Sequence, residues 1–406
     1  MIYFETYGCP SNKADTEAMK VLLGDKVCED MGKADIVIIN SCGVKGQTER
    51  KILKRISRLC NEKKVIVTGC LPKITEKIDI RASLMGINVS DIVSVVSEVE
   101  RGRHVEMVLD RHENKVLLKR HSHLISIIPI SEGCRGACTY CATRFARGSL
   151  HSFPKEDIVG VIENAYASGS QEFHITAQDT GCWGQERKKT LADLMSSIEA
   201  IEGDFFIRVG MMNPDSICDF LDELVCTFTH RRIYKFLHLP IQSGSEKILR
   251  DMGRRYEKED IFEIVNAFRR KIDDLYLCTD IIVGFPTETE EDFSETLDFV
   301  ARLRPDKINA TMYSPRPKTI SSRMKDMPDR IKKERSRTLF RLRMDIARAI
   351  NQRYVGHKFS CFIDECGTKR NLGRLFNYKP VVVDGHLGER KEVEIVDCTP
   401  TYLVSR

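Results

Sequence analysis

The chain has 406 residues, of which 42% are hydrophobic and 30% are charged, and its formal net charge at pH 7 is +5. This length suggests two or three domains, and the composition is ordinary for a globular protein. No apolar run approaches the length of a membrane span, and the first residues show no secretion signal. We therefore expect a cytoplasmic protein with no membrane partner, whose fifteen cysteines are metal ligands or core residues rather than disulfides. The modest positive charge permits a polyanionic partner without requiring one.

Strand-like and helix-like segments alternate over residues 1–105, which predicts an N-terminal parallel α/β domain. Strands are expected at residues 1–6, 34–40, 64–68 and 92–96, and helices at residues 12–23 and 47–60. Three cysteines, Cys9, Cys42 and Cys70, each follow the end of one of these strands. Ligands of open parallel sheets bind beside the carboxyl ends of the strands, and a glycine adjacent to each cysteine allows close approach of a bulky group. We expect a three-thiolate cluster site; the alternative, buried free cysteines, is our interpretation of Cys28 and Cys60.

A polar segment, residues 103–119, is expected to connect this domain to a second one at residues 120–345. The second domain opens with an apolar strand at 124–130, followed by Cys134, Cys138 and Cys141 at C-x3-C-x2-C spacing. Three thiolates can ligate three irons of a four-iron cluster and leave the fourth iron open to substrate. A structural zinc site would need a fourth ligand, which is not evident nearby, and three core cysteines in so polar a segment would be unusual.

Five further strands with intervening helices follow, so the second domain is predicted to be a barrel-like α/β domain with its chemistry at the carboxyl strand ends. The strands are expected at 172–176, 205–209, 236–239, 276–282 and 308–311, and the helices at 156–167, 190–200, 216–228, 258–270 and 291–303. Polar and glycine-containing loops follow several strands at 177–181, 240–245 and 283–289. These loops are either cofactor contacts or ordinary turns with helix caps. His174 and His238 are interpreted as core histidines.

A basic helix at 330–353 has nine Lys or Arg residues against two acids, with apolar residues at helical spacing. It is either a solvated face or a surface that follows a phosphate backbone. The remainder changes to short β segments at 358–364, 373–376, 380–383, 391–396 and 402–404, which predict a small five-stranded barrel in a domain at 346–406. Its charge is nearly balanced, so RNA affinity would need Arg374, Lys379 and Lys369 to cluster beside Phe376 and Tyr378.

The loop motif, C-x3-C-x-aromatic-C, resembles that of the radical S-adenosylmethionine (SAM) enzymes. The segments around Cys9 (TYGCxxN), Cys42 (NSCGV) and Cys70 (GCLP) resemble the N-terminal domain of the radical SAM methylthiotransferases. One difference is that many members have Gln soon after the third cysteine, whereas in this sequence Lys73 follows Pro72. The segment NLGRLFNYKPV, residues 371–381, resembles the TRAM domain, an RNA-binding barrel. The resemblance covers essentially the whole chain and implies an α/β protein with a central partial (β/α)6 radical SAM barrel and a small C-terminal TRAM-like β-barrel.

The same resemblance implies two [4Fe-4S] clusters and SAM as cofactors. Cys134, Cys138 and Cys141 would hold the SAM-binding cluster, and Cys9, Cys42 and Cys70 an auxiliary cluster that carries the sulfur to be transferred. No catalytic residue is assigned beyond the cluster ligands. SAM contacts are expected at Tyr140, Gln178, Asp179, Thr180, Arg208, Gln242, Ile282 and Gly284.

The phrase CTYCxTxxARG, which ends at Gly148, resembles the archaeal and eukaryotic branch that methylthiolates C2 of N6-threonylcarbamoyladenosine next to the tRNA anticodon. The fragment GCPSN at residues 8–12 leans toward the branch that modifies a ribosomal-protein aspartate, and isopentenyladenosine tRNA is a further alternative substrate. A non-catalytic, metal-containing RNA-binding protein is the alternative from another class. The expected partners are the tRNA anticodon stem-loop, an electron donor such as flavodoxin or ferredoxin, and a sulfur donor. Substrate contacts are expected at Arg144 and Arg147, which could pair with the threonylcarbamoyl carboxylate, and at Arg374 and Lys379.

Overall fold

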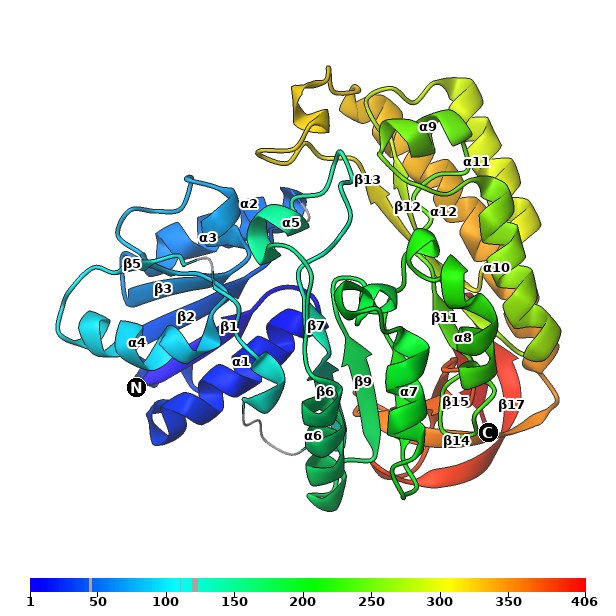
Figure 1. The fold of residues 1–406 in the computed structure, drawn as a ribbon, viewed down its shortest axis with the longest axis horizontal. Helices are drawn as coiled ribbons and strands as arrows, with labels where there is room; N and C mark the ends of the chain where they lie inside the picture. The colour runs from blue at the N-terminus through cyan, green and yellow to red at the C-terminus, as the bar shows by residue number, and fades with distance from the viewer. Residues whose placement is uncertain (44–45, 110, 119–122) are drawn as a thin grey trace.

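A five-stranded parallel sheet forms the N-terminal domain, on the left of Figure 1. Its strands lie in chain order: β1 (Ile2–Thr6), β2 (Ile36–Ser41), β3 (Lys64–Gly69), β4 (Ser83–Met85) and β5 (Glu106–Met107). One face carries α1 (Pro10–Leu23) and α4 (Ile92–Glu100), and the other carries α2 (Gly46–Leu59) and α3 (Leu71–Ile74). Every residue of β2 is buried, as expected for a parallel strand covered on both faces.

The strand predicted at 92–96 is wrong, because these residues begin helix α4. Its buried residues, Ile92, Val95, Val96 and Val99, recur at helical spacing and pack against the sheet. β-branched residues are enriched in strands, so residue preference favoured the wrong element where the spacing indicated the right one.

The computed structural model describes residues 1–43, 46–109, 111–118 and 123–406. Residues 110 and 119 of the expected connection and residue 120, the expected start of the second domain, lie outside the described residues, as do Val44 and Lys45. Among the described residues, no helix is both long enough and apolar enough to cross a membrane.

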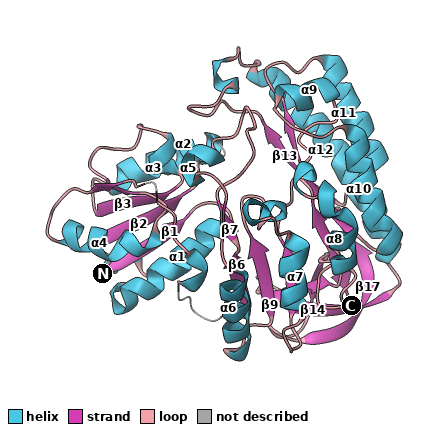
Figure 2. Ribbon diagram, viewed as in Figure 1, coloured by secondary structure: helices cyan, strands magenta, loops and turns pink. Residues whose placement is uncertain are grey.

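Six parallel strands form the middle domain, with helices on their outer side (Figure 2). The strands follow one another as β6 (Ile125–Pro129), β9 (Glu172–Thr176), β10 (Phe206–Val209), β11 (Phe236–His238), β12 (Tyr276–Val283) and β13 (Lys307–Met312). A bridge between Ile207 and Ile233 joins the sheet β6–β9–β10 to the sheet β11–β12–β13. This open, curved arrangement confirms the predicted partial (β/α)6 barrel.

The helices of this domain follow the strands in the expected alternation. They are α6 (Lys155–Ala167), α7 (Leu191–Glu199), α8 (Leu221–Phe228), α9 (Glu246–Asp251), α10 (Lys258–Lys271), α11 (Glu290–Leu303) and α12 (Asp329–Asn351). Between β6 and α6, the chain forms the short strand pair β7 (Ser131–Glu132) and β8 (His151–Ser152), with α5 (Thr143–Arg147) between them.

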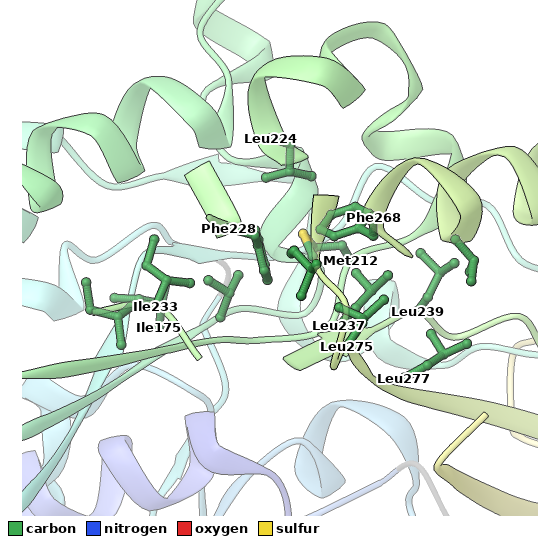
Figure 3. Packing of buried hydrophobic residues seen from close by; sticks show 14 of the residues in the cluster. Ile175, Met212, Leu224, Phe228, Ile233, Leu237, Leu239, Phe268, Leu275 and Leu277 are labelled. Atoms are coloured by element: carbon green, nitrogen blue, oxygen red, sulfur yellow. The ribbon is translucent and has the colours of Figure 1, made fainter. Parts of the chain in front are cut away.

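The outward side chains of the barrel strands pack on the helices to form the main core. Figure 3 shows Ile175 of β9 and Leu237 of β11 in one cluster with Leu224 and Phe228 of α8. Alternate residues of the same strands point to the opposite face, because side chains alternate along a strand. The inner face of the barrel is therefore left to a different set of residues, many of them polar or aromatic, among them His174, Arg208 and His238.

A closed five-stranded barrel forms the C-terminal domain, in the order β14–β15–β16–β18–β17. The strands are β14 (Lys358–Glu365), β15 (Asn371–Leu375), β16 (Pro380–Val383), β17 (Arg390–Cys398) and β18 (Leu403–Ser405). Helix α12 runs past the predicted domain boundary at 345–346 and contributes Ile346 and Ile350 to a core shared by both domains. The small barrel is therefore packed against the large barrel rather than loosely tethered to it.

The turn between β15 and β16, residues 376–379, inserts into the inner side of the large barrel. Tyr378 packs edge-on against Tyr234, and the guanidinium of Arg208 lies over its ring. Lys379 is buried, and its ammonium donates to Asp306 and Asn351. This turn therefore forms a floor for the barrel at the end opposite to the cysteine loop.

Candidate active site

Cys134, Cys138 and Cys141, here the loop triad, lie on the loop that follows β6 and β7. The amide of Gly136 donates to the Cys134 sulfur at 3.2 Å. A Cβ atom on Gly136 would lie 3.3 Å from that sulfur and 3.6 Å from the Cys138 sulfur. The loop thus wraps around the sulfurs, and glycine keeps the space between them clear of a side chain.

The environment of the loop triad favours bound metal over free thiolates. Burial raises the pKa of the Cys134 thiol to about 12, and burial also raises the pKa of Cys138 although Arg254 opposes this shift. A buried thiolate needs a compensating cation, and an iron–sulfur cluster supplies one while accepting amide hydrogen bonds at sulfur. The donor set therefore fits a [4Fe-4S] cluster.

Cys9, Cys42 and Cys70, here the strand-end triad, follow β1, β2 and β3. The register pairs Thr6 with Asn40 and Ser41 with Gly69, so the three strands end at one edge. A Cβ atom on Gly8 would lie 3.2 Å from Cβ of Cys42, and one on Gly43 would lie 3.6 Å from Cβ of Cys70. The three cysteines, distant in sequence, are therefore neighbours at this edge.

A buried amide pair fixes the strand-end triad. Asn12 donates to the Asn40 side-chain oxygen at 2.7 Å and accepts from the Cys9 thiol at 3.3 Å. Asn40 in turn donates to the Asn12 carbonyl and to Thr16. Because both amides are satisfied within the protein, the turns that carry Cys9 and Cys42 are held together without any ligand.

The two triads lie on facing surfaces of two domains. Helix α5, which follows the loop triad, packs on α3, which follows Cys70, and Cys70, Ile74, Ala142 and Ala146 form one buried cluster. Gln178 accepts from the Gly133 amide at 2.7 Å and donates to Ser11 of α1 at 3.3 Å. In Figure 1, α5 lies beside α2 and α3 above the blue sheet.

No three His, Cys, Asp or Glu side chains within 1–43, 46–109, 111–118 and 123–406 stand at the spacing of a single metal ion. Each triad would instead place one thiolate on each of three irons of a cluster, which needs a wider spacing.

Tyr140 and Ile282, both expected at SAM, are brought together. They border one apolar cluster with Ile248, Met252, Phe285 and Tyr313, beside the loop triad. Gln242 lies in the loop after β11, where it bridges to Ile281 of β12 with φ = 78°, a conformation that a non-glycine residue adopts at a cost. Its backbone bonds to Asp280 and Ile282 hold it there. These three residues line the same end of the barrel as the loop triad.

Asp179 and Thr180 are buried, and their side chains are bonded within the protein, so their expected role as SAM contacts stays a prediction. The Asp179 carboxylate accepts bonds from Asn213, Ser216 and Gly181, and the Thr180 hydroxyl donates to the carbonyls of Gly210 and Met211. With its oxygens already used, Asp179 organises the loops of two adjacent strands.

Gly284 and Arg208 also have structural roles that the sequence did not reveal. A Cβ atom on Gly284 would lie 2.3 Å from Cγ of Lys332, so this glycine is required by the close approach of α12. Arg208 lies over the rings of Phe236 and Tyr378, with centroid distances of 4.6 and 5.1 Å, near the barrel floor. Their expected contacts with SAM stay a prediction.

The four expected substrate residues divide into one exposed and three largely buried side chains. Arg144 is exposed on α5, next to Phe145, which is 44% exposed. Arg147 is 4% exposed and lies in an ion-pair cluster. Arg374 pairs with Asp364 and Glu365, and Lys379 pairs with Asp306. The ammonium of Lys379 and Nη1 of Arg147 are engaged within the protein and shielded from solvent. Both residues therefore have internal roles, and their direct contact with substrate stays a prediction.

Arg254 was missed by the sequence analysis. Its guanidinium donates to Asn213 at 2.8 Å and lies over the rings of Tyr140 and Tyr256. The same residue opposes the effect of burial on the pKa of Cys138, which places a buried cation beside the loop triad. The sequence contains no motif that would have singled out this arginine, since its partners come from three different loops.

Comparisons with known proteins agree with this geometry. The model of the Radical SAM superfamily matches residues 128–300, and that of the Uncharacterized protein family UPF0004 matches residues 1–88. The radical SAM methyltransferase TsrM from Kitasatospora setae has a similar fold, with a TM-score of 0.58 and 13% identity over 79% of this chain and 73% of that one. The fold and the loop triad thus define a radical SAM enzyme.

Curated relatives narrow the family. A probable threonylcarbamoyladenosine tRNA methylthiotransferase from Pyrococcus abyssi is 47% identical over 99% of this chain and 98% of its own length. The corresponding protein of Archaeoglobus fulgidus is 43% identical over 100% and 98%, and the enzyme of Drosophila melanogaster is 34% identical over 99% and 77%. The chain belongs to the threonylcarbamoyladenosine tRNA methylthiotransferase family. Its cofactors are accordingly SAM and two [4Fe-4S] clusters.

Proposed function

We propose that this enzyme methylthiolates C2 of N6-threonylcarbamoyladenosine beside the anticodon of tRNA. The observation that carries the proposal is the meeting of the two cysteine triads at one domain interface, where α5 packs on α3. One triad suits the cleavage of SAM, and the other suits delivery of sulfur. Because the C2–H bond has no acidic proton, acid–base catalysis cannot break it, and the SAM-bound cluster supplies the radical that can.

The residues of this chain divide the work by position. Tyr140 and Ile282 would pack against the adenine of SAM, and Gln242 holds its loop toward the same end of the barrel. The cation of Arg254 beside Cys138 is placed to meet the carboxylate of SAM. Asn12 and Asn40 fix the strand-end triad that delivers the sulfur.

Exposed residues of α5 provide the substrate contacts. Arg144 pairs with the carboxylate of the threonylcarbamoyl group, a geometry in which guanidinium can form two parallel bonds. Phe145 offers an exposed ring on which an unstacked base can lie. Both residues follow the loop triad directly, so a base held there is near the radical source.

A row of exposed cations on α2 provides the track for tRNA. Arg50, Lys54 and Arg58 lie one turn apart, with Lys51 beside them. Glu49 of the same helix forms a buried pair with Arg316 of the middle domain, which fixes α2 at the domain junction. Exposed cations on a fixed helix suit the phosphate backbone of a stem-loop whose base enters at α5.

The proposal also includes a cytoplasmic location, an electron donor such as flavodoxin or ferredoxin and a separate sulfur donor. Its direct test is analysis of nucleosides by mass spectrometry after anaerobic reaction of the reconstituted enzyme with SAM, a reductant and tRNA. We expect the methylthio product with tRNA that carries threonylcarbamoyladenosine. The same tRNA with isopentenyladenosine or unmodified adenosine should give none. Product on isopentenyladenosine alone, or on a ribosomal-protein aspartate, would reject the proposed substrate.

The Arg144→Ala variant sharpens this test. Loss of the guanidinium should lower kcat/KM for threonylcarbamoyladenosine tRNA by roughly 10- to 100-fold, the usual cost of one charge-assisted interaction. SAM cleavage without tRNA should be unchanged. Arg135→Ala, in the loop that precedes α5 and bonded to Gln185, is a matched control for loss of one positive charge.

A further inference from the structure

A buried ion-pair cluster joins the two domains between the cysteine triads. Arg147, the last residue of α5, donates through Nη1 to Asp15 of α1 at 3.0 Å and to Glu132 of β7 at 2.8 Å. Lys115 pairs with the same two carboxylates, at 3.4 Å and 2.8 Å. The side chains of these four residues are 2–6% exposed. Two cations and two anions balance one another, so the cluster is complete as an internal salt bridge.

One nitrogen of the Arg147 guanidinium takes no part in these ion pairs. Its Nη2 atom is buried and has no hydrogen-bond partner among the described residues, whereas Nη1 serves two carboxylates. A buried guanidinium donor without a partner is costly, so its retention calls for an explanation. A group that binds in the holoenzyme is the simplest one.

The strand-end triad lies next to α5, the helix that carries Arg147. Ala146, adjacent in the chain, belongs to one buried cluster with Cys70 and Ile74, and α5 packs on α3. Burial lowers the pKa of Arg147, and Cys70, Asp15, Glu132 and Cys9 raise it in that order of effect, so that it stays well above its usual value. Cys70 and Cys9 of the strand-end triad are thus among the groups that act on the guanidinium.

We propose that Arg147 is a positioning residue of the auxiliary cluster, with Nη2 donating a hydrogen bond to sulfur at the strand-end triad. The acceptor is a cluster sulfide or the anionic sulfur at the open iron. Asp15 and Glu132 hold the guanidinium in a fixed plane, so that Nη1 faces the domain junction and Nη2 remains for the cluster. Hydrogen bonds to sulfur and nearby positive charge stabilise the more negative, reduced cluster and raise its reduction potential.

This inference deepens the proposed function and rests on it only for the identity of the cluster. It predicts properties of the auxiliary cluster that can be measured without tRNA. A failure of the substrate assignment would appear in the nucleoside analysis, and a failure of the Arg147 assignment would appear in the cluster spectra, so the two can be distinguished.

The test compares three variants of the reconstituted, two-cluster holoenzyme with the native protein. Arg147→Lys keeps the charge that faces Asp15 and Glu132 but lacks the planar fork. The double variant Arg147→Gln with Glu132→Gln removes a cation and an anion together and so leaves no unbalanced buried charge. Lys115→Gln is the matched control, because it removes a cation from the same two carboxylates but leaves Nη2 of Arg147 in place.

Two readouts apply: the reduction potential of each cluster by EPR-monitored titration, and the affinity of the auxiliary cluster for methanethiolate by its EPR shift. Arg147→Lys and the double variant should lower the potential of the auxiliary cluster and weaken methanethiolate binding by about tenfold or more. The potential of the loop-triad cluster should not change. Lys115→Gln should leave both auxiliary properties near native values.

Native values in both Arg147 variants would overturn the proposal. An equal change in Lys115→Gln would also overturn it, because the effect would then be that of any cation in the ion-pair cluster. Should the single substitution fail to fold, the charge-balanced double variant gives the same decision.

Discussion

The two cysteine triads of this enzyme are assembled by different means. The loop triad spans eight residues, and its cradle depends on local backbone, with Gly136 lying between two of the sulfurs. The strand-end triad needs three strands in register and a buried Asn12–Asn40 pair before its sulfurs meet. The loop triad can therefore be lost while its domain stays folded, whereas the strand-end triad depends on the whole sheet. Substitutions should separate the functions of the two triads.

Loss of the loop triad should have the largest effect. Replacing Cys134, Cys138 and Cys141 with Ala should abolish reductive SAM cleavage and leave about half of the iron, since the strand-end triad uses other thiolates. Iron analysis and assay of 5′-deoxyadenosine measure both. Iron that is unchanged, or lost completely from a folded variant, would show that the triads are not independent cluster sites.

Loss of the strand-end triad should remove a different part of the reaction. With Cys9, Cys42 and Cys70 replaced by Ala, SAM cleavage should persist within about threefold of the native rate, which is less than 1 kcal/mol in activation free energy. No methylthio nucleoside should form. If a folded variant cannot cleave SAM, the division of labour between the triads is incorrect.

The comparison extends to the surfaces on either side of the junction. Replacing Arg50, Lys51, Lys54 and Arg58 of α2 with Gln should weaken tRNA binding. The log–log dependence of affinity on salt should flatten by about 0.7–0.9 for each lost phosphate contact. The matched control replaces four exposed cations of α12, on the far flank in Figure 1: Arg330, Lys333, Arg337 and Arg341. A smaller change in slope for α2 than for α12 would place the RNA on the other side.

The structure of α12 also changes the interpretation of this basic helix, because not all of its cations are exposed. Arg335 is buried against Glu288 and Glu290, and Arg343 donates to the Ile308 carbonyl. Two of its arginines therefore hold α12 on the barrel and are unavailable to phosphate. The helical spacing that predicted the apolar face of α12 could not show which of its cations are bonded to the barrel and which are exposed.

The smallest expected effect concerns pH. The strand-end triad is fixed by an uncharged amide pair, whereas the barrel beneath the loop triad holds His238 against Asp280 at 2.6 Å. Burial lowers the pKa of His238, but Cys278 and Asp280 outweigh it and raise the pKa to about 9. A folded-state pKa above the unfolded value of about 6.5 stabilises the fold below pH 6.5, and this contribution disappears as pH rises through 9.

We expect the unfolding midpoint to fall between pH 6.5 and 9, by an amount equivalent to a few kcal/mol at most. The drop should be smaller in a His238→Gln variant. The Asn40→Ala variant, which breaks the amide pair instead, should lower stability by a similar amount at both pH values. An identical pH profile in native protein and His238→Gln would exclude this pair as the source.

Most of the fold could be predicted from the local spacing of apolar residues and from the alternation of strands and helices. The strands that bear the cysteines, the partial barrel and the five-stranded C-terminal barrel all follow from periodicity and turn residues, and the spacing of the loop motif predicts its cluster site. The spacing of Ile92, Val95 and Val99 would have given α4, had it been weighed above their β-branched character.

Side-chain direction was not accessible in the same way. Asp179 and Arg208 lie in the expected loops or strands, yet one turns behind the site and the other toward the barrel floor. Arg254 depends on Asn213, Tyr140 and Tyr256 from separate loops, a convergence that no single segment records. Spacing predicts where a residue lies along the chain, whereas these roles depend on three-dimensional packing.

The floor formed by residues 376–379 limits how this enzyme can be divided. Tyr378 and Lys379 belong to the C-terminal barrel by sequence but to the interior of the large barrel by contact. Removing the last domain would open the interior of the large barrel. It would also leave Asp306 without its cationic partner, Lys379. A chimaera that exchanges this domain with that of a relative must therefore transfer compatible residues at Arg208, Tyr234 and Asp306 as well, so the boundary for modular engineering runs through the middle domain.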